Sequence, residues 1–297
     1  MNEEYILGVK VNTKLSMEDV IFRIDQMLAD GKFHYITTTN PEFIIDAQRD
    51  PEFKDIINNS DLSLPDGSGV VQAEYFLKRI KELKSKKIDI LFPVKAFWLG
   101  MKTGFSPKAK KDFSPRIIGV DLVYKICEYA EKNNKTIFLL GGRNRDRLGR
   151  FIEDDQEIAH LAGVELKNKF PALRLIGETS KFSHKEYDDK ASVEYIHRCM
   201  SYHNLEVLDF LIVAYNHVNQ EKWIVRNGYN IPAKMCLGVG GALDYLCNNK
   251  KRSPEVYIRL NIEWLYKFIT QPWRFKRIFK AFPTFPLKIF LSSLTHN

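Results

Sequence analysis

Short, β-rich apolar runs alternate with amphipathic helical stretches along most of this 297-residue chain, and this alternation constrains the fold most strongly. Buried parallel strands are continuous apolar runs, and the helices between them cover both faces of the sheet. We therefore predict an α/β fold with a Rossmann-like, mostly parallel sheet and helices on both faces. The candidate strands are residues 5–11, 33–38, 62–65, 135–140, 173–177, 208–215 and 233–239.

Helix signals fill the gaps between these strands. Ser16 and Asp19 have the spacing of a capping box before an amphipathic stretch over residues 17–30, and Gly31 follows as a stop signal. Further helices are predicted over residues 41–49, 119–133, 144–160, 185–200, 218–227 and 254–270.

The formal net charge of +8 is concentrated in two segments. Residues 78–112 carry eleven Lys and Arg against three acidic residues, and residues 250–297 carry ten against two. We interpret residues 1–249 as an α/β core with a basic, aromatic insertion at 78–112, and residues 250–297 as a basic, aromatic, helical C-terminal appendage. The charge and aromatic rings of both segments favour an anionic membrane surface, with nucleic acid or plain solvated helices as alternatives.

Sequence features also exclude several classes of protein. No stretch of 18 apolar residues is uninterrupted, so we expect no membrane-spanning helix. The N-terminus lacks the basic and apolar regions of a secretory signal, which predicts a cytoplasmic protein. The four scattered cysteines form no CxxC motif, and no residues have a convincing metal-ligand spacing, so we expect reduced thiols and no metal site.

Polar residues follow the apolar runs at the points where the predicted strands end. Ligands of open α/β sheets lie at the carboxyl ends of the strands, so these clusters are candidate binding loops. Taken singly, each is also explained as an ordinary turn or helix cap. The clusters are residues 37–41, 65–69, 139–143, 215–221 and 237–241.

Together with further motifs, these clusters resemble, in order, the elements of the WecG/TagA/CpsF glycosyltransferase family (glycosyltransferase family 26). The resemblance covers nearly the whole chain and rests on several ordered motifs. The motifs are Thr38-Thr39-Asn40-Pro41-Glu42, Asp66-Gly67-Ser68-Gly69, Arg116-Ile117-Ile118-Gly119-Val120-Asp121-Leu122, Phe138-Leu139-Leu140-Gly141-Gly142, Val239-Gly240-Gly241-Ala242-Leu243-Asp244, Arg252-Ser253-Pro254 and Glu263-Trp264-Leu265-Tyr266.

Three features depart from the family pattern. Residues 216–221 keep the Gln-Glu of the usual G-x-P-K-Q-E element but lose its Gly, Pro and Lys. Lys267 stands where an Arg is usual, and the 78–112 insertion is longer than expected. We expect these departures to affect donor recognition, acceptor specificity or membrane docking.

The resemblance implies a Rossmann-like core of the GT-E type and an appendage that meets the membrane and completes the active site. It implies an inverting enzyme that moves an N-acetylhexosamine, its uronic acid or glucose from a UDP-sugar to a sugar on a polyprenyl diphosphate, in bacterial cell-envelope or exopolysaccharide synthesis. We expect no cofactor and no metal, and a peripheral location on the inner face of the plasma membrane. The partners expected are the UDP-sugar, the lipid-linked acceptor and the membrane, without nucleic acid; homo-oligomerisation stays open.

The resemblance also assigns roles to residues. Asp66 is the predicted general base, which takes the proton of the acceptor hydroxyl, and its place in a Gly-flanked strand-end turn suits that role. Arg274 and Arg277, with Lys267 as a third cation, are predicted to stabilise the departing UDP. The residues expected around the donor sugar and catalytic centre are Thr38, Asn40, Arg116 and Gln220, and the expected nucleotide contacts are Gly240, Gly241 and Asp244.

Other interpretations stay open at this point. The arginines of the appendage also fit a role as membrane-facing charges, and Arg116 fits a structural ion pair. The altered loop at 216–221 is compatible with a noncatalytic subunit that binds nucleotide sugars or polysaccharide. A nicotinamide-dependent enzyme that uses the Gly238–Gly241 turn, and nucleic-acid binding by the appendage, are two further alternatives.

Overall fold

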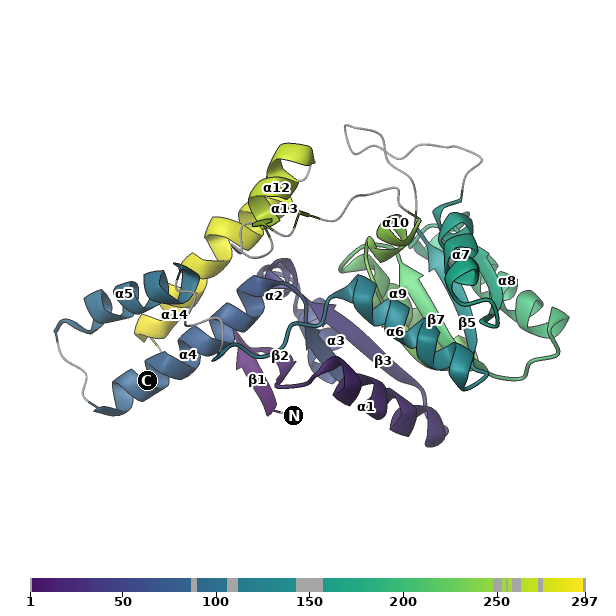
Figure 1. Ribbon diagram of the computed structural model, residues 1–297, viewed down its shortest axis with the longest axis horizontal. Helices are drawn as coiled ribbons and strands as arrows, with labels where there is room; N and C mark the ends of the chain where they lie inside the picture. The colour runs from purple at the N-terminus through teal and green to yellow at the C-terminus, as the bar shows by residue number, and fades with distance from the viewer. Residues whose placement is uncertain are drawn as a thin grey trace.

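The computed structural model describes residues 2–86, 90–105, 112–142, 157–247, 253–254, 256–257, 263–271 and 275–295. Its centre is a six-stranded sheet in the order β4-β3-β8-β7-β5-β6, in which every neighbouring pair is parallel (Figure 1). This confirms the predicted α/β fold. The strands are β3 (His34–Thr39), β4 (Leu62–Pro65), β5 (Thr136–Gly141), β6 (Arg174–Thr179), β7 (Leu208–Ala214) and β8 (Ala233–Gly238).

The single strand predicted over residues 5–11 is wrong. The chain forms an antiparallel hairpin there, with β1 (Asn2–Ile6) and β2 (Val9–Thr13) joined at Leu7 and Gly8. Both turn residues have left-handed backbone angles, with φ of 52° and 75°, as a two-residue hairpin turn of the primed type requires. The apolar run therefore reverses direction at its glycine.

Helices cover both faces of the sheet, as predicted. The capping box is present, because Asp19 N–H donates to Ser16 Oγ at 3.1 Å and Ser16 N–H donates to Asp19 Oδ2 at 2.9 Å. The helices close to their predicted bounds are α1 (Met17–Ala29), α2 (Pro41–Ala47), α6 (Gly119–Lys132), α8 (Asp189–Tyr202, after a 3₁₀ turn at Glu186–Asp188) and α9 (Asn219–Asn227).

Several helices differ from the prediction. The sequence did not predict α3 (Pro51–Asn59), although Asp50 caps it. Most of the predicted helix at 144–160 lies outside the described residues, and α7 spans Ile158–Lys169. The short α10 (Ala242–Leu246) and a 3₁₀ turn (Gly228–Asn230) complete this half of the molecule, while α12 (Glu263–Thr270) lies within the helix predicted at 254–270.

The basic insertion belongs to a helical arm. Helix α4 (Ser68–Lys86) begins directly after the Asp66-Gly67 turn, and α5 (Phe92–Phe105) folds back onto it. The C-terminal segment adds α13 (Phe275–Phe279), a kinked connection (Lys280–Thr284) in which Phe282 has extended backbone angles, and α14 (Phe285–Thr295). Figure 1 shows α4, α5 and α14 together at one end of the molecule, with α7 and α8 at the other.

Three hydrophobic clusters hold these layers together. One packs α1, α6, α7 and α10 on one face of the sheet, and another packs α8 and α9 on the opposite face. The third joins the β1–β2 hairpin to α2, α4 and α5, and it includes Phe285 and Ile289 of α14. Part of the predicted appendage is therefore a component of the hydrophobic core. Within the described residues, no helix is both long and apolar enough to cross a bilayer.

Candidate active site

The parallel sheet brings four of the predicted polar clusters to neighbouring strand ends. Strands β4, β3, β8 and β7 are consecutive neighbours, and their register pairs Pro65 with Thr39, and Gly238 with both Thr37 and Val213. Parallel strands end at the same edge of a sheet. The turns that contain Asp66, Asn40, Gly240 and Gln220 therefore lie along one carboxyl edge, where open α/β sheets bind their ligands.

Backbone hydrogen bonds fix the turn that contains Asp66. The Asp66 N–H donates to Thr39 O at 2.9 Å, which ties the turn to the end of β3. The Ile117 N–H donates to Pro65 O at 3.0 Å, so the segment with Arg116 runs alongside the end of β4. Gly67 has a φ of +95°, which side-chain-bearing residues rarely adopt. Asp66 and Arg116, both half-buried, thus come from adjacent segments.

Thr38 lies near the end of β3, and Asn40 lies in the turn directly after the strand. The Thr38 hydroxyl donates to Gly238 O at 3.1 Å, so it links β3 to the end of β8. Asn40 caps α2, because its Oδ1 accepts from the N–H groups of Glu42 and Phe43 at 2.9 and 3.2 Å. The helix-cap alternative for Asn40 is thus observed. With Oδ1 engaged, the side chain would offer its amide Nδ2 as a donor to a ligand.

Gln220 joins two of the loops. Its Oε1 accepts from the Gly240 N–H at 2.7 Å, and its Nε2 donates to Glu221 Oε1 at 2.6 Å. Only 1% of Gln220 is exposed, so this side chain supports the Gly240 turn from the protein interior. The glycine at position 238 makes room for both side chains, because a Cβ there would lie 2.6 Å from each.

Glu221 is a buried carboxyl group that the sequence interpretation did not assign a role. It is fully buried, and burial raises its pKa to about 8, against the lowering effect of the hydrogen bond from Gln220. Its Oε2 has no hydrogen-bond partner among the residues that the structure describes. A protonated Glu221 at neutral pH follows, since an ionised carboxylate is costly to bury without a cation.

The predicted nucleotide contacts lie at the start of α10. Gly240 has a φ of +56°, and Gly241 lies beside Asp244, whose Oδ2 would be 3.3 Å from a Cβ at that position. Asp244 is 8% exposed. The Gly240 N–H donates to Gln220 Oε1 and the Ala242 N–H to Val239 O, so the turn offers a ligand close approach to a glycine backbone with a carboxylate nearby.

The C-terminal segment reaches the same edge through α2. Arg277 Nε donates to Glu42 Oε2 at 2.6 Å, two residues beyond Asn40, and Lys280 pairs with Asp46 one turn further along. Arg277 is thus brought close to the strand-end loops. Arg274 lies outside the described residues; Lys267 belongs to α12, and its side chain lies outside them as well.

His217 connects the altered loop to this ionic cluster. Its Nε2 lies 3.0 Å from Asp46 Oδ2 and 3.8 Å from Glu42 Oε2, and its ring stacks on Phe43. Burial alone would raise the pKa of Asp46, but hydrogen bonds from His217 and Lys280 bring it below its ordinary value. The loop that departs from the family pattern is therefore anchored on α2 by a histidine.

The sequence interpretation missed the carboxylates of α2 as partners of the C-terminal cations. Glu42 was visible as the last residue of the Thr38–Glu42 motif, but its partner Arg277 lies 235 positions away in sequence. Glu221 was visible only as a retained Gln-Glu pair. Among the described residues, no group of three or more His, Cys, Asp or Glu side chains is arranged to hold a metal ion.

Comparison with known proteins gives a consistent result. The sequence model described as Glycosyl transferase WecG/TagA/CpsF family matches residues 4–96 and 103–297. Residues 97–102, in the middle of α5, fall between the two matched ranges.

Curated relatives share about a quarter of their residues with this chain. A Staphylococcus aureus protein named N-acetylglucosaminyldiphosphoundecaprenol N-acetyl-beta-D-mannosaminyltransferase is 26% identical over 286 residues, covering 96% of this chain and 91% of the relative. Proteins of the same name from Bacillus subtilis and Bacillus spizizenii are 26% and 25% identical. They cover 86% and 84% of this chain, and 78% and 77% of their own lengths are matched.

Proposed function

Because the chain belongs to the WecG/TagA/CpsF glycosyltransferase family and is therefore a glycosyltransferase, we propose that it transfers a sugar from a UDP-sugar to a sugar on a polyprenyl diphosphate carrier. The reaction would proceed with inversion and serve bacterial cell-envelope or exopolysaccharide synthesis. The observation that carries this proposal is the placement of the turns with Asp66, Asn40, Gln220 and Gly240 along one carboxyl edge of the sheet.

The relatives' names favour one donor class. They transfer an N-acetylmannosaminyl group to N-acetylglucosaminyl diphosphoundecaprenol, so an N-acetylhexosamine is the first donor to test. Its uronic acid and glucose remain donors to compare, because the loop at residues 216–221 differs from the usual family element.

In the proposed mechanism, the acceptor hydroxyl oxygen attacks the anomeric carbon on the face opposite the UDP. Asp66 takes the hydroxyl proton as the new C–O bond forms and the bond to the diphosphate breaks. The departing UDP carries off the bonding electrons and gains negative charge. Arg277, together with Arg274 and Lys267, would stabilise that charge.

Gln220 and Glu221 would position the nucleotide-binding turn without contacting the reacting atoms. The Gly240 N–H donates to Gln220 Oε1 at 2.7 Å, and this hydrogen bond fixes the turn proposed to receive the nucleotide. A neutral Glu221 keeps Gln220 oriented without placing a negative charge beneath the diphosphate. We also propose that no metal takes part, and excess EDTA should then leave the rate unchanged.

We further propose that the protein works as a peripheral protein on the inner face of the plasma membrane. Its acceptor is lipid-linked, and the C-terminal segment that would meet the bilayer is ion-paired to α2, beside the strand-end loops. Membrane contact and the catalytic edge would thereby be coupled.

A donor screen tests the proposed function. Purified protein would be incubated with UDP-N-acetylmannosamine, UDP-N-acetylglucosamine, UDP-glucose and a UDP-uronic acid, each with a lipid-diphosphate N-acetylglucosamine acceptor, and UDP release would be measured. We expect acceptor-dependent release from at least one donor. Binding of a UDP-sugar without release from any of them would instead favour the noncatalytic binding subunit.

A further inference from the structure

Helix α5 is apolar on two sides, but only one of them is covered. Phe92 and Ala96 are buried in the cluster that α5 shares with α4, and the partly buried Leu99 packs against the same cluster. A second stripe at helical spacing points outward and is exposed. Its members are Leu91, Val94, Phe97, Trp98 and Met101, and Trp98 is 66% exposed.

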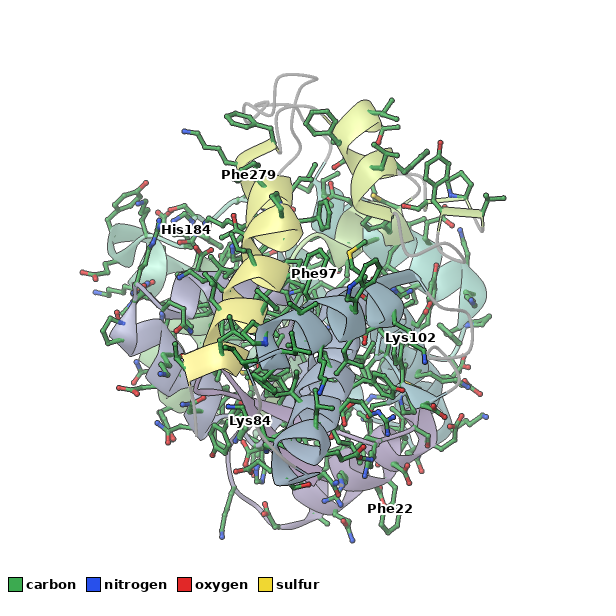
Figure 2. The ribbon with its side chains drawn as sticks, turned by 90° about the vertical axis from the view of Figure 1, so that its left-hand side faces the viewer. Phe22, Lys84, Phe97, Lys102, His184 and Phe279 are labelled. Atoms are coloured by element: carbon green, nitrogen blue, oxygen red, sulfur yellow. The ribbon has the colours of Figure 1, made fainter. Side chains whose placement is uncertain are left out.

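Helix α14 continues this surface. Phe285 and Ile289 face the core, while Leu287 and Leu291 are exposed. The two helices contact each other, and the rings of Phe97 and Phe290 meet edge-on with their centroids 6.3 Å apart. Figure 2 looks onto this end of the molecule, where α5 and α14 both face the viewer, with Phe97 on α5 and Phe279 on α13. Exposed apolar stripes of this extent mark binding surfaces.

The charge of this surface has one sign. The sequence contains no Asp or Glu in α5 or anywhere in residues 275–295. Lys95, Lys102 and Lys276 are exposed, whereas the cations that pair with α2 are Arg277 and Lys280. Exposed aromatic and aliphatic side chains beside lysines, without acids, match a bilayer of anionic lipids, where rings enter the interface and ammonium groups meet headgroups.

The middle of α5 falls outside the two ranges that the family model matches. Residues 97–102, which hold Phe97, Trp98, Met101 and Lys102, are the ones that fall between the matched ranges. Membrane contact by the C-terminal segment alone would not explain why α5 carries an uncovered apolar stripe of its own.

We propose that α5 is a second membrane-docking element, which enters an anionic bilayer beside α13 and α14 through Trp98 and Met101 and contacts lipid headgroups through Lys102. This inference extends the proposed function, because it identifies the surface that would present the enzyme to a lipid-linked acceptor. It concerns binding to lipid and not the chemistry at the strand ends.

Vesicle sedimentation tests the proposal with the full chain. Wild-type protein should sediment with vesicles of phosphatidylglycerol and phosphatidylcholine, and much less with phosphatidylcholine alone. Trp98→Ser should weaken binding by about tenfold or more, because a large ring leaves the interface. Lys102→Glu should weaken it by about five- to tenfold at low salt, and the loss should shrink as salt is added.

Phe22 on α1 provides the matched control. It is 63% exposed, close to Trp98, and Figure 2 shows it at the edge of this view, away from Phe97 and Phe279. Phe22→Ser should bind vesicles like the wild type. Lipids brominated in their acyl chains should quench wild-type tryptophan fluorescence more than that of Trp98→Phe, which gives a second measurement that needs no destabilising change.

The outcomes separate this proposal from the proposed function. Trp98→Ser should keep its UDP release with a short-chain, water-soluble acceptor. Unchanged vesicle binding of both α5 variants, or quenching that does not depend on Trp98, would overturn the role of α5 and leave the transferase proposal intact. Failure of the wild-type protein to bind protein-free vesicles would also overturn the role of α5 in membrane docking, and would favour a protein partner for this surface. Absent UDP release by the wild type would count against the transferase proposal alone.

Discussion

The two halves of the proposed site are held by different kinds of contact. The strand-end half is fixed by hydrogen bonds between adjoining strand ends, such as those from Asp66 N–H to Thr39 O and from Gly240 N–H to Gln220 Oε1. The C-terminal half arrives on separate helices and is held by ion pairs to Glu42 and Asp46 and by the burial of Phe285. The first half follows from the order of the strands in the sheet, whereas the second depends on side-chain contacts made by helices outside the sheet.

Asp66→Asn, in the strand-end half of the site, should have the largest effect on the rate of transfer. The amide keeps the shape of the side chain but is not a base, so kcat should fall by about 10²–10⁴-fold. UDP-release kinetics would measure this loss, and UDP affinity should stay near the wild-type value. A near-wild-type kcat would remove Asp66 from the role of general base.

Phe285→Ala should test whether the C-terminal half is part of the folded core. Phe285 is 2% exposed and lies near Gly69 in the first turn of α4, so the substitution should cost about 3–5 kcal/mol in the free energy of unfolding. Urea unfolding measures this cost, and Leu287→Ala on the exposed side of α14 is the control, at under about 0.5 kcal/mol. Equal costs for the two variants would mean that α14 does not stabilise the core.

Arg277→Ala should separate leaving-group stabilisation from docking of the segment. The proposed mechanism assigns Arg277 to stabilisation of the departing UDP, so we expect kcat to fall by about 10²-fold. Glu42→Gln keeps the guanidinium and removes only the charge of its partner, so its effect should be much smaller. If both variants slow transfer equally, Arg277 acts only as a docking contact.

Glu221→Gln should change the pH dependence of stability. In the folded protein Glu221 has a pKa of about 8, against an ordinary value of 4.5, so below about pH 4.5 both states are protonated. As pH rises to about 8, only the unfolded state ionises, and the wild type should lose about 2–4 kcal/mol relative to Glu221→Gln. Urea unfolding at pH 5 and pH 8 measures the difference. A constant difference would show that Glu221 is ionised in the fold.

The sequence predicted the sheet better than the arm, for physical reasons. Runs such as Leu62–Pro65 are buried strands whose apolar character is local, and the Ser16 capping box closes within one turn. Helix α4 was not predicted, because Gly67 and Gly69 suggested a loop and the basic segment after them suggested an irregular insertion. The hairpin at Leu7 was missed because an apolar run does not reveal where it reverses.

The same distinction applies to the site. Strand-end polar clusters are visible as motifs, and the topology alone gathers them at one edge. The contact between His217 and Asp46 and the raised pKa of Glu221 depend on burial and long-range packing, which no local pattern encodes. Residues that act through such contacts emerge only from the tertiary structure.

Hydrogen exchange with and without UDP is the decisive test of an active site at the carboxyl edge of the sheet, because it locates the nucleotide without relying on turnover. UDP should slow exchange of the backbone amides in the turns at residues 66–69 and 238–242. Exchange at the hairpin of residues 2–13 should not change. Protection confined to segments away from the carboxyl edge, or no protection at saturating UDP, would contradict the assignment of this edge as the active site.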